Sequence, residues 1–188
     1  MMAHFPDNRH AAVAETYDFS KLRLIADIGG GNGAALRHIL GRFPETRGIV
    51  FDRTDVVRAI ARSDLMEGRI ETIGGSFFES VPTGADAYIL SRVLHDWSDE
   101  DCLRILRVCR AGMPMQSRLL IVEHLIEPDP TRGKPTDYLT DMQMMAMFGT
   151  ARSRTEEEFR ALLPQAGFAL RRVIATKSPV SLLEAAPV

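Results

Sequence analysis

The chain has 188 residues, of which 45% are hydrophobic and 26% are charged, and its formal net charge is −2. This length suits one globular domain with a sizeable core, and the balance of residue types excludes a disordered chain. The scattered arginines form no basic run for nucleic acid or anionic lipid, and no apolar stretch approaches the roughly 20 residues of a membrane span. Residues 1–13 contain no signal-peptide core, so a cytoplasmic location is expected.

Apolar residues recur along the chain with the spacing of alternating strands and helices. In chain order they predict a lead-in helix at 10–19, a strand at 22–29, a helix at 34–43, a strand at 47–52, a helix at 55–62, strands at 69–75 and 85–93, a helix at 101–112 and a strand at 118–126. Thr155 and Glu158 predict a capping box for a further helix that ends at Gly167. Residues 168–176 and 178–185 predict two final strands, placed as a hairpin at the sheet edge. The rhythm is typical of an α/β fold with a doubly wound, mostly parallel sheet of seven strands.

Two cysteines, Cys102 and Cys109, fall seven residues apart on the helix predicted at 101–112. With this spacing they are expected to share one helix face as small buried residues. No disulfide framework or zinc-ligand spacing surrounds them. We therefore expect no metal site.

A glycine-rich loop, IADIGGGNG at 25–33, joins the first predicted strand to the helix that follows. Glycines at 29, 31 and 33 allow a sharp turn and the close approach of a ligand to the backbone. Gly29, Gly31 and Ala34 also fit the loose dinucleotide pattern G-x-G-x-x-A, so NAD is one candidate ligand.

Two carboxylates near this loop restrict the choice of ligand. Asp27 lies two residues before the first glycine, where a negative charge is unfavourable beside a pyrophosphate but suits a cationic group. Asp52 ends the second predicted strand, where a carboxylate can accept hydrogen bonds from both ribose hydroxyls. A nucleoside with a cationic group fits both residues, whereas NAD fits Asp52 alone.

The stretch VLHDWSDEDC at 93–102 places a histidine and an aspartate where a buried strand ends and a helix begins. Ser98 and Asp101 predict a cap for that helix, so His95 lies in a strand-to-helix loop. Ligands of open α/β sheets usually bind at such loops. His95 is therefore a candidate catalytic residue, with a merely structural loop histidine as the alternative.

Taken together, D-x-G-x-G-x-G, FDRTDVV, GGSFFESVP, LHDWSDEDC, VEHLIEP and RTEEEFRALLPQAGF resemble the small-molecule O-methyltransferases of class I, which include caffeate, flavonoid and bacterial polyketide enzymes. The likeness runs from about residue 15 to about residue 185, in order and with matching spacing. It implies S-adenosyl-L-methionine as cofactor and a small aromatic hydroxyl compound as substrate. It also implies a Rossmann-like methyltransferase fold.

The resemblance assigns the cofactor site residue by residue. The glycine loop, carried by Gly29 and its neighbours, would bind the methionine part, and Asp52 would bind the ribose. The family usually has an Asp and a Met after its third strand to contact adenine, and here Ser76 and Phe77 stand in their places. Arg92 stands where a lysine often precedes the HDW motif and keeps the positive charge.

For catalysis the resemblance implies that His95 is the general base, which takes the proton of a phenol during attack on the methyl group. Family enzymes orient this histidine with two glutamates, of which the first matches Glu123. The second position is occupied by Ser153. Asp96 is a candidate second partner, or an acid that only complements the helix dipole.

Residues 141–149 carry four methionines at helical spacing. In the family this helix is a wall of the substrate pocket, so Met142 and Met145 are candidate substrate contacts, with a place in the core as the equal alternative. The family also has a helical N-terminal dimerisation domain that nothing here matches. Residues 1–20 are therefore expected to be a lead-in to a catalytic domain at 21–188. The full-length protein is expected to be a homodimer, and this chain alone to bind the cofactor with little turnover.

The sequence leaves two other functions open. An NAD-dependent oxidoreductase agrees with the loose glycine pattern but leaves the HDWSD stretch unexplained. A non-catalytic module that binds a cofactor or a partner is suggested by Ser153 and by the unmatched dimerisation domain.

Overall fold

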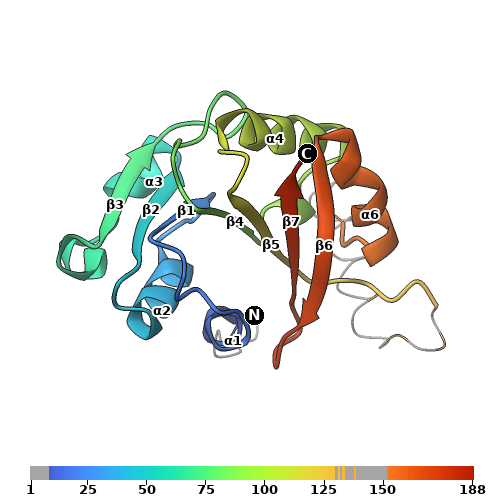
Figure 1. Cartoon of the computed structure of the whole chain (residues 1–188), viewed down its shortest axis with the longest axis horizontal. Helices are drawn as coiled ribbons and strands as arrows, with labels where there is room; N and C mark the ends of the chain where they lie inside the picture. The colour runs from blue at the N-terminus through green and yellow to red at the C-terminus, as the bar shows by residue number, and fades with distance from the viewer. Residues whose placement is uncertain (1–8, 130, 132, 134–137, 139–151) are drawn as a thin grey trace.

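The computed structural model describes residues 9–129, 131, 133, 138 and 152–188. Its seven strands are β1 (Leu24–Ile28), β2 (Arg47–Asp52), β3 (Ile70–Gly74), β4 (Ala87–Ser91), β5 (Arg118–Glu123), β6 (Phe168–Ala175) and β7 (Ser181–Pro187). They form one sheet in the order β3-β2-β1-β4-β5-β7-β6 (Figure 1). Strands β1 to β5 pair in parallel, and β7 runs antiparallel to both β5 and β6. The predicted α/β fold with a mostly parallel sheet of seven strands is confirmed.

Helices cover both faces of this sheet. They are α1 (Arg9–Thr16), α2 (Ala34–Arg42), α3 (Thr54–Arg58), α4 (Asp99–Gly112) and α6 (Glu156–Gln165), with the short 3-10 helices η1 (Arg62–Gly68) and η2 (Leu94–Asp96). One buried cluster packs α1 and α2 against the sheet through Val13, Leu36 and Ile39, and a second packs α4 and α6 through Ile105 and Phe159. Burying one apolar stripe of each helix in this way provides the main favourable free energy of the fold.

Both cysteines lie inside the second cluster, as expected. Cys102 and Cys109 are fully buried, free thiols on the inner face of α4. Burial raises the pKa of the Cys102 thiol to about 11 and that of Cys109 to about 12. At neutral pH both remain protonated and act as small apolar residues.

The chain order of the strands places a crevice at one edge of the sheet. From β1 the chain moves outward to β2 and β3, and then crosses to β4 on the other side of β1. The chain therefore leaves the carboxyl ends of β1 and β4 in opposite directions. This is a topological switch point, where open α/β sheets bind their ligands. The glycine loop follows β1, η2 follows β4, and Glu123 ends β5, so all three predicted site segments meet at this edge.

Some predicted elements differ from the structure in their bounds. The helix expected at 55–62 ends at Arg58, because the backbone at Ala61 is extended, with a φ of −67° and a ψ of 145°, before η1 begins. The strand expected at 118–126 ends at Glu123. The final two strands form an antiparallel hairpin at the edge of the sheet, as predicted, with β7 paired to β5 and β6 outermost.

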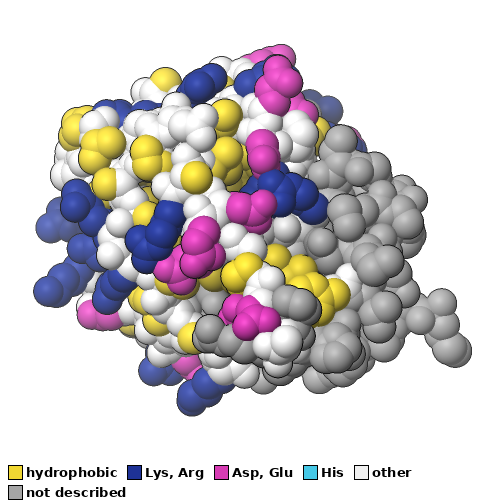
Figure 2. All heavy atoms as spheres, turned by 90° about the vertical axis from the view of Figure 1, so that its right-hand side faces the viewer, with side chains coloured by type: hydrophobic (Ala, Val, Ile, Leu, Met, Phe, Trp, Pro, Cys, Tyr) yellow, Lys and Arg dark blue, Asp and Glu magenta, His cyan; other side chains and the backbone are white. Residues whose placement is uncertain are grey.

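On the side of the molecule where α6 and β6 lie, basic and acidic side chains are interspersed over the described surface (Figure 2). This distribution agrees with a net charge of −2 and gives that face no field of a single sign. Within the described residues, none of the helices combines the length and the apolar character needed to cross a lipid bilayer.

Candidate active site

The glycine loop turns tightly because its residues lack side chains. Gly29 has a φ of +72°, and a Cβ atom there would lie 2.8 Å from Val93 Cγ2. A Cβ on Gly30 would lie 2.8 Å from the Asp27 carboxyl carbon. The backbone N–H of Gly29 donates to the Phe51 carbonyl at 2.7 Å, which fixes the loop against β2. Side chains at either glycine would displace the loop, so the packing around it requires glycine at both positions.

Asp27, the fourth residue of β1, lies directly beneath this loop. Its carboxyl group is fully buried, and neither oxygen has a hydrogen-bond partner among the described residues. Burial, together with the nearby charge of Asp52, raises the pKa of the Asp27 carboxyl from 3.8 to about 7. Burying an unpaired carboxylate costs free energy, and a cationic ligand group beside Asp27 would offset that cost.

Asp52 ends β2 on the opposite side of the loop. One carboxylate oxygen accepts the Gly31 N–H at 2.9 Å, and the other accepts the Arg53 N–H at 2.7 Å. These bonds hold the carboxylate beside the turn, and each carboxylate oxygen retains further capacity to accept hydrogen bonds.

A cavity of about 350 Å³ opens between this loop, β4 and α1. Asp27, Gly29, Gly31, Arg92 and His95 line it as predicted site residues, and Gly30, Asn32 and Ala34 belong to the predicted glycine-loop pattern. The other lining residues, which the sequence did not indicate, are Arg9, His10, Ala35 and Ser91. The cavity therefore has a buried carboxyl group together with cationic side chains from α1 and from the segment after β4. Groups of both signs around one cavity suit a ligand that carries an ammonium and a carboxylate, such as the amino-acid end of S-adenosylmethionine.

The other predicted cofactor residues do not line this cavity. Gly33 precedes the first residue of α2 with a φ of +77°, and Ser76 Oγ accepts the Phe78 N–H at 3.3 Å. Phe77 is half-buried and meets the Trp97 ring edge-on at a centroid distance of 5.9 Å. An edge of its ring would lie 3.5 Å from a Cβ on Gly29, so Phe77 borders the glycine loop.

Arg92 adopts a strained backbone conformation. Its φ of +59° is left-handed, an uncommon state for a residue with a side chain, and its N–H donates to the Val122 carbonyl at 2.9 Å. Such outliers persist where the surrounding structure holds them, and they cluster at functional sites. The strain occurs where the chain leaves β4 and turns into η2.

His95 lies in η2 between two carboxylates. Its Nδ1 lies 3.1 and 3.3 Å from the two Glu123 oxygens, and its Nε2 lies 3.2 Å from Asp96 Oδ1. The backbone N–H of His95 also donates to Glu123 Oε1 at 3.3 Å. Glu123 is only 2% exposed, whereas the Asp96 side chain is 56% exposed. The buried glutamate therefore fixes the ring, and the exposed aspartate can turn away to leave Nε2 accessible.

The remaining predicted site residues have different outcomes. Met142 and Met145 lie outside the described residues, so the predicted substrate wall stays a prediction. Ser153 stands between Arg152, whose N–H donates to the His95 carbonyl at 2.9 Å, and Arg154, whose guanidinium donates to the Leu94 carbonyl at 2.7 Å. The segment with the missing family glutamate therefore lies against the His95 loop.

Comparison with known proteins places these features in a family. The O-methyltransferase domain family matches residues 8–169. The chain is 44% identical over 183 residues to phenazine O-methyltransferase PhzM of Lysobacter antibioticus, covering 94% of this chain and 52% of that protein. It is 42% identical over 168 residues to a 3-amino-4-hydroxybenzoate 4-O-methyltransferase of Streptomyces cremeus, covering 87% and 45%.

Among solved structures, CalO1, a methyltransferase in calicheamicin biosynthesis in its SAH-bound form, matches with a TM-score of 0.86 at 34% identity. The match covers 96% of this chain and 53% of that one. This chain spans about half the length of the curated relatives that it matches.

Proposed function

Because the chain belongs to the O-methyltransferase domain family, we propose that it is the cofactor-binding and catalytic domain of an S-adenosylmethionine-dependent O-methyltransferase acting on a small aromatic hydroxyl compound. The observation that carries the proposal is the His95–Glu123 pair beside a cavity that contains the unpaired carboxyl group of Asp27. The family membership leaves the NAD-dependent alternative without support.

In this proposal the chain holds the cofactor at four places. Asp27 accepts the ammonium of the methionine end, whose positive charge compensates the buried carboxylate. Asp52 accepts the ribose hydroxyls through charge-assisted hydrogen bonds. Ser76 and Phe77 lie beside the adenine. Arg92 contributes positive charge near the carboxylate of the cofactor's methionine end. The bound cofactor supplies an electrophilic methyl group on a sulfonium ion.

His95 acts as the general base. With its Nδ1 held by Glu123, the ring carries a proton on Nδ1 and presents the Nε2 lone pair. Nε2 removes the proton of the acceptor hydroxyl as its oxygen attacks, and Glu123 stabilises the imidazolium that forms. Asp96, whose Oδ1 lies 3.2 Å from Nε2, turns away to leave that lone pair to the acceptor hydroxyl, and its charge lies close to the imidazolium once this has formed.

We also propose how the protein is organised and what it binds. Residues 1–20 lead into the domain at 21–188, Met142 and Met145 contact the acceptor, and the full-length protein is a cytoplasmic homodimer that binds neither nucleic acid nor membrane. The net charge of −2 and the interspersed surface charges support the last point.

A methyl-transfer assay tests the proposal. Transfer of label from S-adenosylmethionine is measured on a panel of phenolic acceptors, for the chain alone and for the chain joined to the N-terminal half of the Lysobacter relative. We expect label in at least one acceptor, with the joined protein more active, because the resemblance implies a helical domain that completes the acceptor pocket. Cofactor binding without transfer in either form would instead favour the non-catalytic module.

A further inference from the structure

Arg154 is a buried arginine just before α6, and it lies against the loop that carries His95. Its side chain is 1% exposed, although a guanidinium is always charged. Burying such a charge is expensive unless each donor has a partner. The partners of Arg154 therefore indicate what the residue does.

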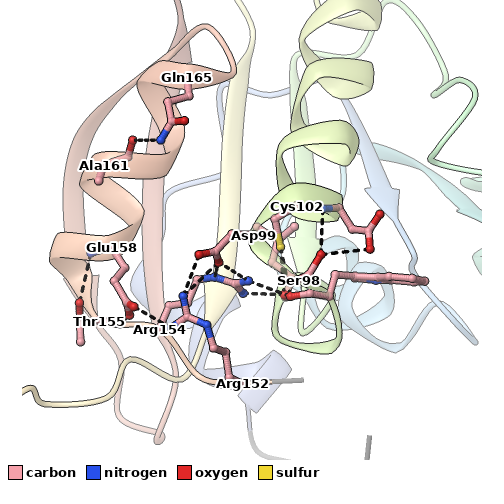
Figure 3. Close-up of polar contacts among 12 residues, drawn as sticks. Ser98, Asp99, Cys102, Arg152, Arg154, Thr155, Glu158, Ala161 and Gln165 are labelled. Carbon is pink, nitrogen blue, oxygen red and sulfur yellow. Dashed lines mark hydrogen bonds and ion pairs between the residues drawn. The ribbon is translucent and has the colours of Figure 1, made fainter. Parts of the chain in front are cut away.

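The guanidinium forms three hydrogen bonds around η2 (Figure 3). It donates to the Leu94 carbonyl at 2.7 Å, to the Trp97 carbonyl at 2.7 Å and to Asp99 Oδ1 at 2.9 Å. The two carbonyls belong to the residues immediately before His95 and immediately after Asp96. Arg154 thus holds the loop on both sides of the candidate base with a rigid planar fork, which a lysine ammonium could not reproduce.

The backbone of the same residue is tied to the other half of the site. Arg154 forms a parallel bridge with Leu125, and its carbonyl accepts the Ile126 N–H at 3.1 Å. These residues directly extend the segment that carries Glu123. One residue therefore links the loop of His95 to the segment of its carboxylate partner.

We propose that Arg154 is a positioning residue that sets the His95 ring against Glu123, and thereby decides which ring nitrogen is free to act as the base. The inference deepens the proposed function, since its consequence for turnover depends on His95 being the base. The Arg154 fork keeps Nδ1 at 3.1 Å from Glu123, so Nδ1 bears the proton, while Nε2 lies beside the exposed Asp96 and is free once that side chain turns away. Without the fork, η2 shifts relative to β5 and the ring loses this preference.

Nuclear magnetic resonance tests this role through the protonation of the His95 ring. A long-range ¹H–¹⁵N spectrum of the whole chain reports which nitrogen of His95 is protonated, with the signal assigned by its loss in His95→Ala. The variants are Arg154→Lys, which keeps the charge without the fork, and Arg154→Met. Arg160→Gln is the matched control, because Arg160 is an exposed arginine of α6 that pairs with Glu156.

We expect the wild type and Arg160→Gln to carry the proton on Nδ1. In a folded Arg154→Lys protein we expect a shift toward Nε2 protonation, while S-adenosylhomocysteine affinity stays within about twofold. Where turnover is measurable, kcat should fall on the order of 10- to 100-fold with an unchanged KM for the cofactor, because small misplacements at a reacting centre have effects of that size.

An unchanged His95 spectrum in a folded Arg154 variant overturns the proposal, even if the methyltransferase activity is confirmed. If methyl transfer is never detected but the spectrum shifts, positioning by Arg154 stands and the proposed function fails. Should both Arg154 variants unfold, Asp99→Ala decides, since it removes the exposed carboxylate oxygen that accepts from the fork. An unshifted spectrum in a folded Asp99→Ala protein would then overturn the proposal.

Discussion

Replacing Asp27 by asparagine should stabilise the ligand-free chain above pH 7 and weaken its binding of S-adenosylhomocysteine. The wild-type carboxyl group is buried without a partner, and its pKa is raised to about 7. Asparagine has nearly the same shape and carries no charge at any pH. The substitution therefore removes the cost of ionising Asp27 in the folded state.

The size of the effect follows from linkage between ionisation and folding. In the unfolded chain the carboxyl group titrates near 3.8, so between about pH 4 and pH 7 the folded state holds a proton that the unfolded state has released. The free energy of unfolding therefore falls as the pH rises through this window. At about 1.4 kcal/mol per pH unit, the loss approaches about 4 kcal/mol above pH 7. For a domain of this size that corresponds to a change in Tm of roughly 10 °C.

Thermal unfolding of the wild type and Asp27→Asn from pH 4 to pH 8 measures this effect. We expect nearly equal Tm values at pH 4 and a higher Tm for the variant at pH 8, with S-adenosylhomocysteine binding at pH 8 weakened about tenfold or more, because a charged acceptor is lost. Asp55→Asn is the matched control, since Asp55 is exposed, and its Tm difference should not grow with pH. Equal Tm values for the wild type and Asp27→Asn at pH 8 would show that ionising Asp27 does not destabilise the folded chain.

Three further substitutions test other parts of the site. Asp52→Ala should weaken S-adenosylhomocysteine binding by about 10- to 100-fold in calorimetry, because two charge-assisted bonds are lost; unchanged affinity would contradict the ribose assignment. His95→Ala should lower turnover by roughly 10²-fold or more with little change in cofactor affinity, and wild-type turnover on a phenolic acceptor would exclude the general base. Thr155→Ala removes the capping box that Thr155 forms with Glu158, and a stability loss of about 1 kcal/mol should appear in denaturant unfolding; an unchanged midpoint would mean that the cap contributes nothing.

Much of the fold could be predicted because the signals are local. Alternating strand and helix patterns indicated the parallel sheet, and the chain order of its strands brings the glycine loop and His95 to one edge. The end of α3 at Arg58 could not be predicted, because residues 59–62 continue the apolar pattern and contain no glycine or proline. The insertion of β7 beside β5 is a long-range pairing that no local pattern specifies.

The candidate site was predicted less completely, for the same physical reason. Asp27, Asp52, His95 and Glu123 fall in short motifs at strand ends, where residue type and spacing are informative. Arg9 and His10 reach the cavity only because α1 packs against α2, which is a tertiary contact. The role of Arg154 depends on burial that a polar stretch such as ARSRT does not indicate.

Calorimetric titration of the wild-type chain with S-adenosylhomocysteine, and separately with NADH, tests whether this is an S-adenosylmethionine site. We expect saturable binding of S-adenosylhomocysteine at a single site, reduced in Asp52→Ala, and no binding of NADH. Binding of NADH in place of S-adenosylhomocysteine, or of neither compound by a folded chain, would contradict this assignment.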